Sequence, residues 1–134
     1  MILVDTNVIL DLVENDPVWA DWSQQQLEMA SVQGVLCINP VIYAELSIAF
    51  HAIEELEAVL ADGEFHLEPI PREALFLAGK VFVNYRKRKG GRTGALPDFF
   101  IGAHAAVAGM PLITHDQRHY ANYFPTLQLI TPPR

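Results

Sequence analysis

Short apolar runs alternate with longer segments of helical spacing along the whole chain. The short runs predict strands, the last of them at a sheet edge. They cover residues 2–4, 35–38, 65–70, 112–113 and 127–130. Between them, segments with apolar residues at helical spacing cover residues 6–13, 16–32, 40–53, 54–61, 71–89 and 99–108. This alternation predicts an α/β fold with a mostly parallel sheet.

The start signals of the expected helices agree with this division. Prolines stand at or near the first position of the helices at Pro17, Pro40, Pro71 and Pro97, where a missing backbone N–H costs nothing. We find no internal repeat, low-complexity tract or long linker in the 134 residues. The chain is therefore expected to form a single domain, residues 1–134.

The composition points to a reduced intracellular setting. Cys37 is the only cysteine, so an intramolecular disulfide is excluded, and its apolar neighbours predict a small core residue in a cytoplasmic protein. The apolar start is interrupted by Asp5 and Asp11 and follows no basic region, so a signal peptide is not expected. No uncharged apolar stretch reaches the roughly 18 residues of a membrane span.

The charge is acidic overall but unevenly placed. The net charge is −7, whereas phosphate binding usually needs a basic surface. Five of the nine basic residues nevertheless fall within seven positions: Arg86, Lys87, Arg88, Lys89 and Arg92. This basic cluster has two interpretations, a contact for nucleic-acid phosphates or a solvated helix end where cations suit the dipole.

Two acidic residues follow predicted strands. Asp5 comes directly after residues 2–4, and Asp116 follows residues 112–113 after Thr114 and His115. Ligands of open α/β sheets bind at the carboxyl ends of the strands, so these two acids are expected to share a crevice. The alternative is that each caps a helix, and the two roles are compatible.

Two further acids lie in predicted helices. Glu45 is surrounded at three and four residues' distance by apolar side chains: Val41, Ile42, Ile48 and Ala49. Its carboxylate therefore needs a partner or a cation, unless it reaches solvent from the helix edge. Asp98 lies in the first turn of the most apolar helix, where the positive end of the dipole alone could explain it.

Taken as a set, the four carboxylates point to a divalent cation. Grouped carboxylates repel one another without a counter-charge, and Mg²⁺ or Mn²⁺ prefers oxygen ligands. Such a site can activate water and neutralise charge on a phosphate. His104, His115 and His119 show no zinc-binding spacing, and His104 is expected to be a packed helix residue.

The chain resembles PIN-domain proteins, especially the VapC-type toxins of toxin–antitoxin pairs. Four motifs carry the resemblance, in the family's order and spread over nearly the whole chain. They are Val4-Asp5-Thr6-Asn7-Val8, Ala44-Glu45-Leu46, Pro97-Asp98-Phe99-Phe100-Ile101-Gly102-Ala103-His104-Ala105 and Leu112-Ile113-Thr114-His115-Asp116. The resemblance implies a three-layer α/β/α sandwich around a parallel sheet.

The resemblance also implies roles for individual residues. The metal ligands, directly or through water, would be Asp5, Glu45, Asp98 and Asp116. Thr114, with Thr6 or Asn7, would hold carboxylates or water in place, although ordinary turn and capping chemistry explains the same residues. Thr6, Asn7 and the basic cluster are the expected contacts with the RNA substrate.

The function implied is that of an Mg²⁺- or Mn²⁺-dependent endoribonuclease, the toxin of a toxin–antitoxin pair. Hydrolysis would leave 5′-phosphate and 3′-hydroxyl ends on transfer or ribosomal RNA. The expected partners are an antitoxin protein and a second copy of the chain. Trp19, Trp22, Tyr43 and Phe50 are candidates for the groove that the antitoxin covers, or plain core residues.

Three other functions remain open at this point. The first is a PIN-type nuclease that processes RNA outside a toxin–antitoxin pair, and the second is a non-catalytic module that binds a protein partner. The third is a phosphatase or receiver domain with an acidic pocket. A haloacid-dehalogenase phosphatase needs a second Asp two residues after the first, where this chain has Asn7, and we find no counterpart of a receiver's paired acids and later lysine.

Overall fold

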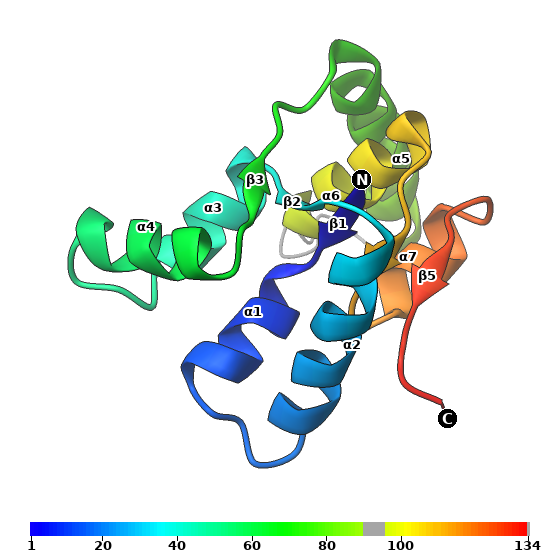
Figure 1. Ribbon diagram of the computed structural model, residues 1–134. Helices are drawn as coiled ribbons and strands as arrows, with labels where there is room; N and C mark the ends of the chain where they lie inside the picture. Colours follow the sequence, from blue (N-terminus) through cyan, green and yellow to red (C-terminus); the bar gives the residue numbers. More distant parts are fainter. Residues whose placement is uncertain (90–95, 134) are drawn as a thin grey trace.

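A parallel sheet forms the centre of the protein (Figure 1). In the computed structural model, which describes residues 1–89 and 96–133, the sheet has five strands in the order β3-β2-β1-β4-β5, all parallel. The strands are β1 (Ile2–Val4), β2 (Leu36–Ile38), β3 (His66–Leu67), β4 (Leu112–Ile113) and β5 (Leu129–Ile130). Lys89, Arg118 and His119 are described by their backbone only.

Helices connect successive strands, as parallel pairing requires. They are α1 (Thr6–Val13), α2 (Ala20–Gln33), α3 (Pro40–Ser47), α4 (Ile53–Asp62), α5 (Arg72–Lys89), α6 (Leu96–Ala108) and α7 (Arg118–Tyr123). Helices α1 and α2 pack against each other, and α5 packs along α6. The predicted α/β/α sandwich with a mostly parallel sheet is confirmed.

The central strands are apolar because both faces of the sheet are covered. All residues of β1, β2 and β4 are buried, and these strands form the core together with the inner faces of α1, α3 and α6. The register pairs Leu3 with Cys37 on one side and with Leu112 on the other. The prediction that Cys37 is a small core residue is confirmed, since it is 0% exposed.

The strand order determines where the sheet can form a crevice for a ligand. From β1 the chain proceeds through β2 and β3 toward one edge, whereas β4 and β5 lie on the other side of β1. The order therefore reverses between β1 and β4, and their carboxyl ends form the switch point at which α/β sheets bind ligands. Asp5 follows β1 and Thr114 follows β4 at that position.

Several predicted elements begin or end at other residues than predicted, including the edge strand β5, which covers only Leu129–Ile130 of the predicted residues 127–130. Helix α2 begins at Ala20 rather than residue 16, because the Asp16 carboxylate accepts the backbone N–H groups of Val18 and Trp19 and closes a turn first. Strand β3 covers only His66 and Leu67 of the predicted residues 65–70. Pro69 ends it, because proline has no N–H to donate to a ladder.

The region predicted as helix over residues 40–61 contains a longer break than expected. Helix α3 starts at Pro40, with Asn39 as its cap, but it ends at Ser47 rather than near residue 53. The Glu55 carboxylate then accepts the backbone N–H groups of His51 and Ala52, which fixes the start of α4. Helix α7 was not predicted at all.

The end of α6 and its buried histidine agree with the sequence. Gly109 has φ +66° and ends the helix, a conformation that favours glycine. His104 is 2% exposed, and its Nδ1 accepts from Asn39 Nδ2 at 3.2 Å, so the prediction of a packed helix residue is confirmed.

Within residues 1–89 and 96–133, no helix has the length and apolar character to cross a membrane.

Candidate active site

All four predicted acids line one cleft at the switch point of the sheet. The cleft has a volume of about 220 Å³. Its lining residues come from the ends of β1 and β4 and from α1, α3, α6 and α7: Asp5, Thr6, Asn7, Leu10, Glu45, Asp98, Asp116 and Tyr120. Residues 5 and 116 thus share a crevice with two acids from helices, as the sequence predicted.

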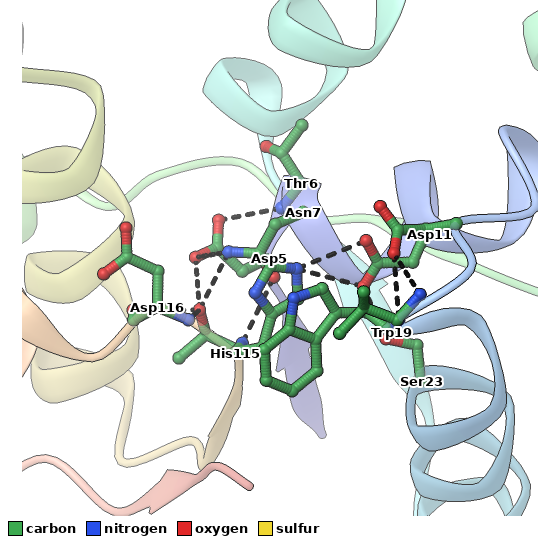
Figure 2. Close-up of polar contacts among 11 residues, drawn as sticks. Asp5, Thr6, Asn7, Asp11, Trp19, Ser23, His115 and Asp116 are labelled. Atoms are coloured by element: carbon green, nitrogen blue, oxygen red, sulfur yellow. Dashed lines mark hydrogen bonds and ion pairs between the residues drawn. The ribbon is translucent and has the colours of Figure 1, made fainter.

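Asp5 is the most deeply buried acid of the cleft. It is 4% exposed and caps α1 through Oδ1, which accepts the Thr6 backbone N–H at 2.8 Å. Its other oxygen, Oδ2, accepts from Thr114 Oγ1 at 2.9 Å, Tyr120 OH at 2.9 Å and Asn7 Nδ2 at 3.2 Å. Figure 2 shows the Thr6 and Asn7 contacts of this carboxylate. The capping role and the site position therefore coexist in one residue.

The electrostatic environment opposes ionisation of Asp5. The pKa of its carboxyl is raised from 3.8 to about 7, mainly by burial and to a smaller extent by the nearby charge of Asp98. Hydrogen bonds from Thr114, Tyr120 and the Thr6 N–H favour the charged form but do not outweigh burial. A positive charge in the cleft would restore ionisation of Asp5 at neutral pH.

Glu45 has the partner that its apolar surroundings required. Thr6 Oγ1 donates to Glu45 Oε1 at 2.6 Å, which joins α1 to α3 across the cleft. Burial, with a smaller contribution from the charge of Asp98, raises the pKa of Glu45, while the Thr6 hydrogen bond lowers it. The Glu45 side chain therefore points into the cleft instead of extending from the helix edge into solvent.

Thr114 and Asn7 join the two central strand ends. Asn7 Nδ2 donates to Thr114 Oγ1 at 3.0 Å, and Asn7 Oδ1 accepts the His115 N–H at 3.3 Å. The Asp116 N–H also donates to Thr114 Oγ1, at 3.0 Å. These bonds place the loop after β4 against the start of α1, so that Asp116 lines the same cleft as Asp5.

A second polar network holds the same loop from the α2 side. His115 Nε2 lies 3.0 Å from Asp11 Oδ2, and Ser23 Oγ donates to that oxygen at 2.8 Å (Figure 2). Trp19 stacks on the His115 ring, with centroids 4.6 Å apart and planes 3° apart. None of these contacts was predicted from the sequence, and the two that involve His115 join residues more than 90 positions apart.

Tyr120 is a cleft residue that the sequence analysis missed. It lies in α7, is 1% exposed, and directs its hydroxyl to Asp5 Oδ2 at 2.9 Å and Asp98 Oδ1 at 3.5 Å. A signal was present, since Tyr120, Tyr123 and Phe124 follow Asp116 at helical spacing.

The donor set fits a hard divalent cation by its chemistry. The cleft offers carboxylate oxygens, which Mg²⁺ and Mn²⁺ prefer, and contains no cysteine or histidine among its lining residues. Within the described part of the chain, no three acidic, histidine or cysteine side chains converge closely enough to form a complete ligand set. Water molecules complete most magnesium sites, so a set of two carboxylates with water remains compatible with the cleft.

Four residues of the basic cluster, Arg86, Lys87, Arg88 and Lys89, form the end of α5. Arg86, Lys87 and Arg88 are exposed. The Arg86 guanidinium carbon lies 5.7 Å from the centroid of the Phe82 ring, and that of Arg88 lies 5.9 Å from the Tyr123 ring in α7. The Lys89 side chain and Arg92 are outside the described residues. The substrate role of the cluster remains a prediction.

The four aromatic groove candidates are all half-buried. Tyr43 and Phe50 line a pocket of about 250 Å³ between α3 and α4, whereas Trp19 and Trp22 pack edge to face beside His115. They are therefore not fully buried core residues, and their part in an antitoxin groove remains a prediction.

The chain is similar to known proteins over nearly its full length. The family profile described as PIN domain matches residues 2–125. Among solved structures, VapBC2 from Rickettsia felis bound to a DNA fragment from its promoter has 20% identity and a TM-score of 0.75, covering 99% of this chain and 100% of that chain. No curated protein sequence matches the chain.

Two further structures show the same fold. VapBC-1 from nontypeable Haemophilus influenzae has 24% identity and a TM-score of 0.69, with 98% of each chain covered. A toxin–antitoxin complex from Klebsiella pneumoniae has 22% identity and a TM-score of 0.69, covering 100% of this chain and 99% of that chain. At these identities the likeness concerns the fold.

Proposed function

Because the chain belongs to the PIN-domain family, we propose that it is the toxin of a toxin–antitoxin pair and an Mg²⁺- or Mn²⁺-dependent endoribonuclease. The observation that carries the proposal is the gathering of Asp5, Glu45, Asp98 and Asp116 in one cleft at the sheet's switch point. The fold shared with toxin–antitoxin complexes over nearly the whole chain supports the biological role.

The chemistry proposed is hydrolysis of an RNA phosphodiester that leaves 5′-phosphate and 3′-hydroxyl ends. A divalent cation, when bound, would make a water molecule more acidic and neutralise charge on the scissile phosphate. Asp5, Asp98, Asp116 and Glu45 would hold it, directly or through water. Without a counter-charge these acids repel a phosphate, so the cation accounts for substrate binding as well.

The surrounding residues keep the acids in place. Thr6 fixes Glu45 by a 2.6 Å hydrogen bond, and Thr114 fixes Asp5 while holding the backbone of Asp116. Thr6 and Asn7 also line the cleft and are proposed to contact the RNA backbone there. The fixed positions of these side chains matter for catalysis, because a displacement of about 1 Å from the productive geometry can lower the reaction rate by a large factor.

The proposed partners are RNA, an antitoxin protein and a second copy of the chain. The exposed Arg86, Lys87 and Arg88 supply positive charge for phosphates in a chain of net charge −7. The pocket beside Tyr43 and Phe50 is a candidate contact for an apolar antitoxin side chain.

Cleavage of total cellular RNA by the purified, antitoxin-free protein tests the proposal. We expect discrete fragments with Mg²⁺ or Mn²⁺, none with EDTA, and a loss of at least about 100-fold for Asp98→Ala, since a missing metal ligand removes the electrostatic stabilisation. Asp21→Ala, a change of the same kind at an exposed position of α2, serves as the matched control and should cleave normally. No metal-dependent cleavage of several RNAs by folded protein would indicate a non-catalytic binding module.

A further inference from the structure

Tyr120 lies at the point where two carboxylates of the cleft approach each other. Its hydroxyl is 2.9 Å from Asp5 Oδ2 and 3.5 Å from Asp98 Oδ1, so it bridges the end of β1 and the start of α6. The ring itself is fixed by packing. At Gly102 of α6, an added Cβ would lie only 3.1 Å from Tyr120 Cδ1, which shows how closely α6 and α7 meet.

The hydrogen bond from Tyr120 makes the surroundings of the two carboxylate oxygens of Asp5 different. Among the described residues, Oδ2 accepts from three side-chain donors, whereas Oδ1 accepts only the Thr6 backbone N–H. A carboxylate has about four lone-pair sites, two on each oxygen. Oδ2 is therefore saturated by the protein, and Oδ1 retains an acceptor site.

We propose that Tyr120 is a positioning residue for the metal site: its hydroxyl holds Asp5 Oδ2 and leaves Oδ1 to the cation. The inference rests on the proposed function, because it requires a cation in the cleft. The hydroxyl carries one proton, so it donates to one carboxylate at a time, and the 2.9 Å contact makes Asp5 the main acceptor.

The burial of Tyr120 suits this role, because its hydroxyl is enclosed by the protein and directed at the acids of the cleft. A phenylalanine would fill the same space against α6 without the hydroxyl. Packing alone therefore does not account for a tyrosine whose buried oxygen faces two acids.

The test compares Tyr120→Phe with Tyr123→Phe. Tyr123 is on the same helix, half-buried, and packs against Tyr85 and Phe99, so this control removes a hydroxyl outside the cleft. Mn²⁺ binding is measured by electron paramagnetic resonance without RNA. We expect Tyr120→Phe to bind Mn²⁺ about 10-fold more weakly, as changes behind metal ligands typically do, and the control to match the unaltered protein.

Cleavage kinetics separate positioning from other roles of Tyr120. The Mn²⁺ concentration for half-maximal cleavage should rise by about the same 10-fold in Tyr120→Phe, while kcat at saturating Mn²⁺ recovers. A thermal melt in EDTA confirms that each variant is folded.

The remaining outcomes each overturn a specific statement. Equal Mn²⁺ affinity of Tyr120→Phe and the unaltered protein refutes the inference and leaves the proposed function standing. A fall in kcat at saturating Mn²⁺, with unchanged Mn²⁺ affinity, means that the hydroxyl acts on RNA and not on the ligands. Absence of Mn²⁺ binding to the unaltered protein refutes both proposals.

Discussion

We predict that ionisation of Asp5 destabilises the metal-free protein at alkaline pH. Asp5→Asn cannot ionise, so the variant should not lose stability in this way as the pH rises. The folded protein raises the pKa of Asp5 from 3.8 to about 7, mainly through burial. Between these two values the folded state holds the proton more tightly than the unfolded state does. The contribution of Asp5 to stability is therefore complete below about pH 4 and is lost as the pH rises to about 7.

The size of the effect follows from the same shift. The rise from 3.8 to about 7 spans roughly three pH units, and each unit corresponds to about 1.4 kcal/mol. The folded state of the unaltered protein thus loses about 4 kcal/mol from this group between acid and alkaline pH. Glu45, Asp98 and Asp116 are present in both proteins, so the difference between them isolates position 5.

The asparagine variant incurs a different cost that does not depend on pH. If its carbonyl oxygen takes the three donors at Oδ2, its amide group faces the Thr6 N–H, and two donors then meet. Such a mismatch costs about 1–3 kcal/mol. Asp5→Asn should be less stable than the unaltered protein by roughly that amount at pH 4, where the contribution of Asp5 is still almost complete, and more stable by about 1–3 kcal/mol at pH 8.5.

Urea unfolding followed by circular dichroism, at both pH values and in EDTA, measures this crossover. Saturating Mn²⁺ at pH 8.5 should reverse the order again, because a cation that binds only the unaltered folded protein stabilises it. A stability difference that is the same at pH 4 and pH 8.5 would falsify the claim that burial opposes ionisation of Asp5.

Two further predictions concern packing and RNA binding. Gly102→Ala should lower the free energy of unfolding by about 1–3 kcal/mol, because the added Cβ would lie 2.5 Å from the Phe124 ring. Gly79→Ala should raise the free energy of unfolding by up to about 1 kcal/mol, because the added Cβ would have no atom within 4 Å. Equal effects in urea unfolding contradict this packing. Changing Lys87 and Arg88 together to Ala should weaken RNA binding and reduce its log–log salt slope by about one to two, whereas an unchanged slope supports a solvated helix end.

The sequence was most informative where apolar runs end in polar residues. Residues 2–4 and 112–113 were predicted with their observed bounds, because strands buried on both faces must be continuously apolar. Parallel strands then bring their carboxyl ends to one edge, which is why Asp5 and Asp116 could be expected in one cleft. The sequence indicated that the Glu45 carboxylate needs a partner, but it did not indicate that this partner is Thr6.

The sequence was least informative where distant segments stabilise each other. Helix α7 has only six residues and depends on the contact of Tyr120 and Phe124 with α6. Isolated helices of that length are not stable in water, so local periodicity gives a weak signal. The His115–Asp11 contact joins residues 104 positions apart, and no local pattern indicates it.

The arrangement of β1 beside β4 determines when during synthesis the site can exist. Asp5 leaves the ribosome before its partners Thr114 and Tyr120, which follow 109 and 115 positions later. A nascent chain can therefore form β1, β2 and much of the helical layer without any working cleft. In a toxin, this order means that the ribosome is exposed to the nuclease only after residues 114–120 have been made, which leaves time for an antitoxin to be present first.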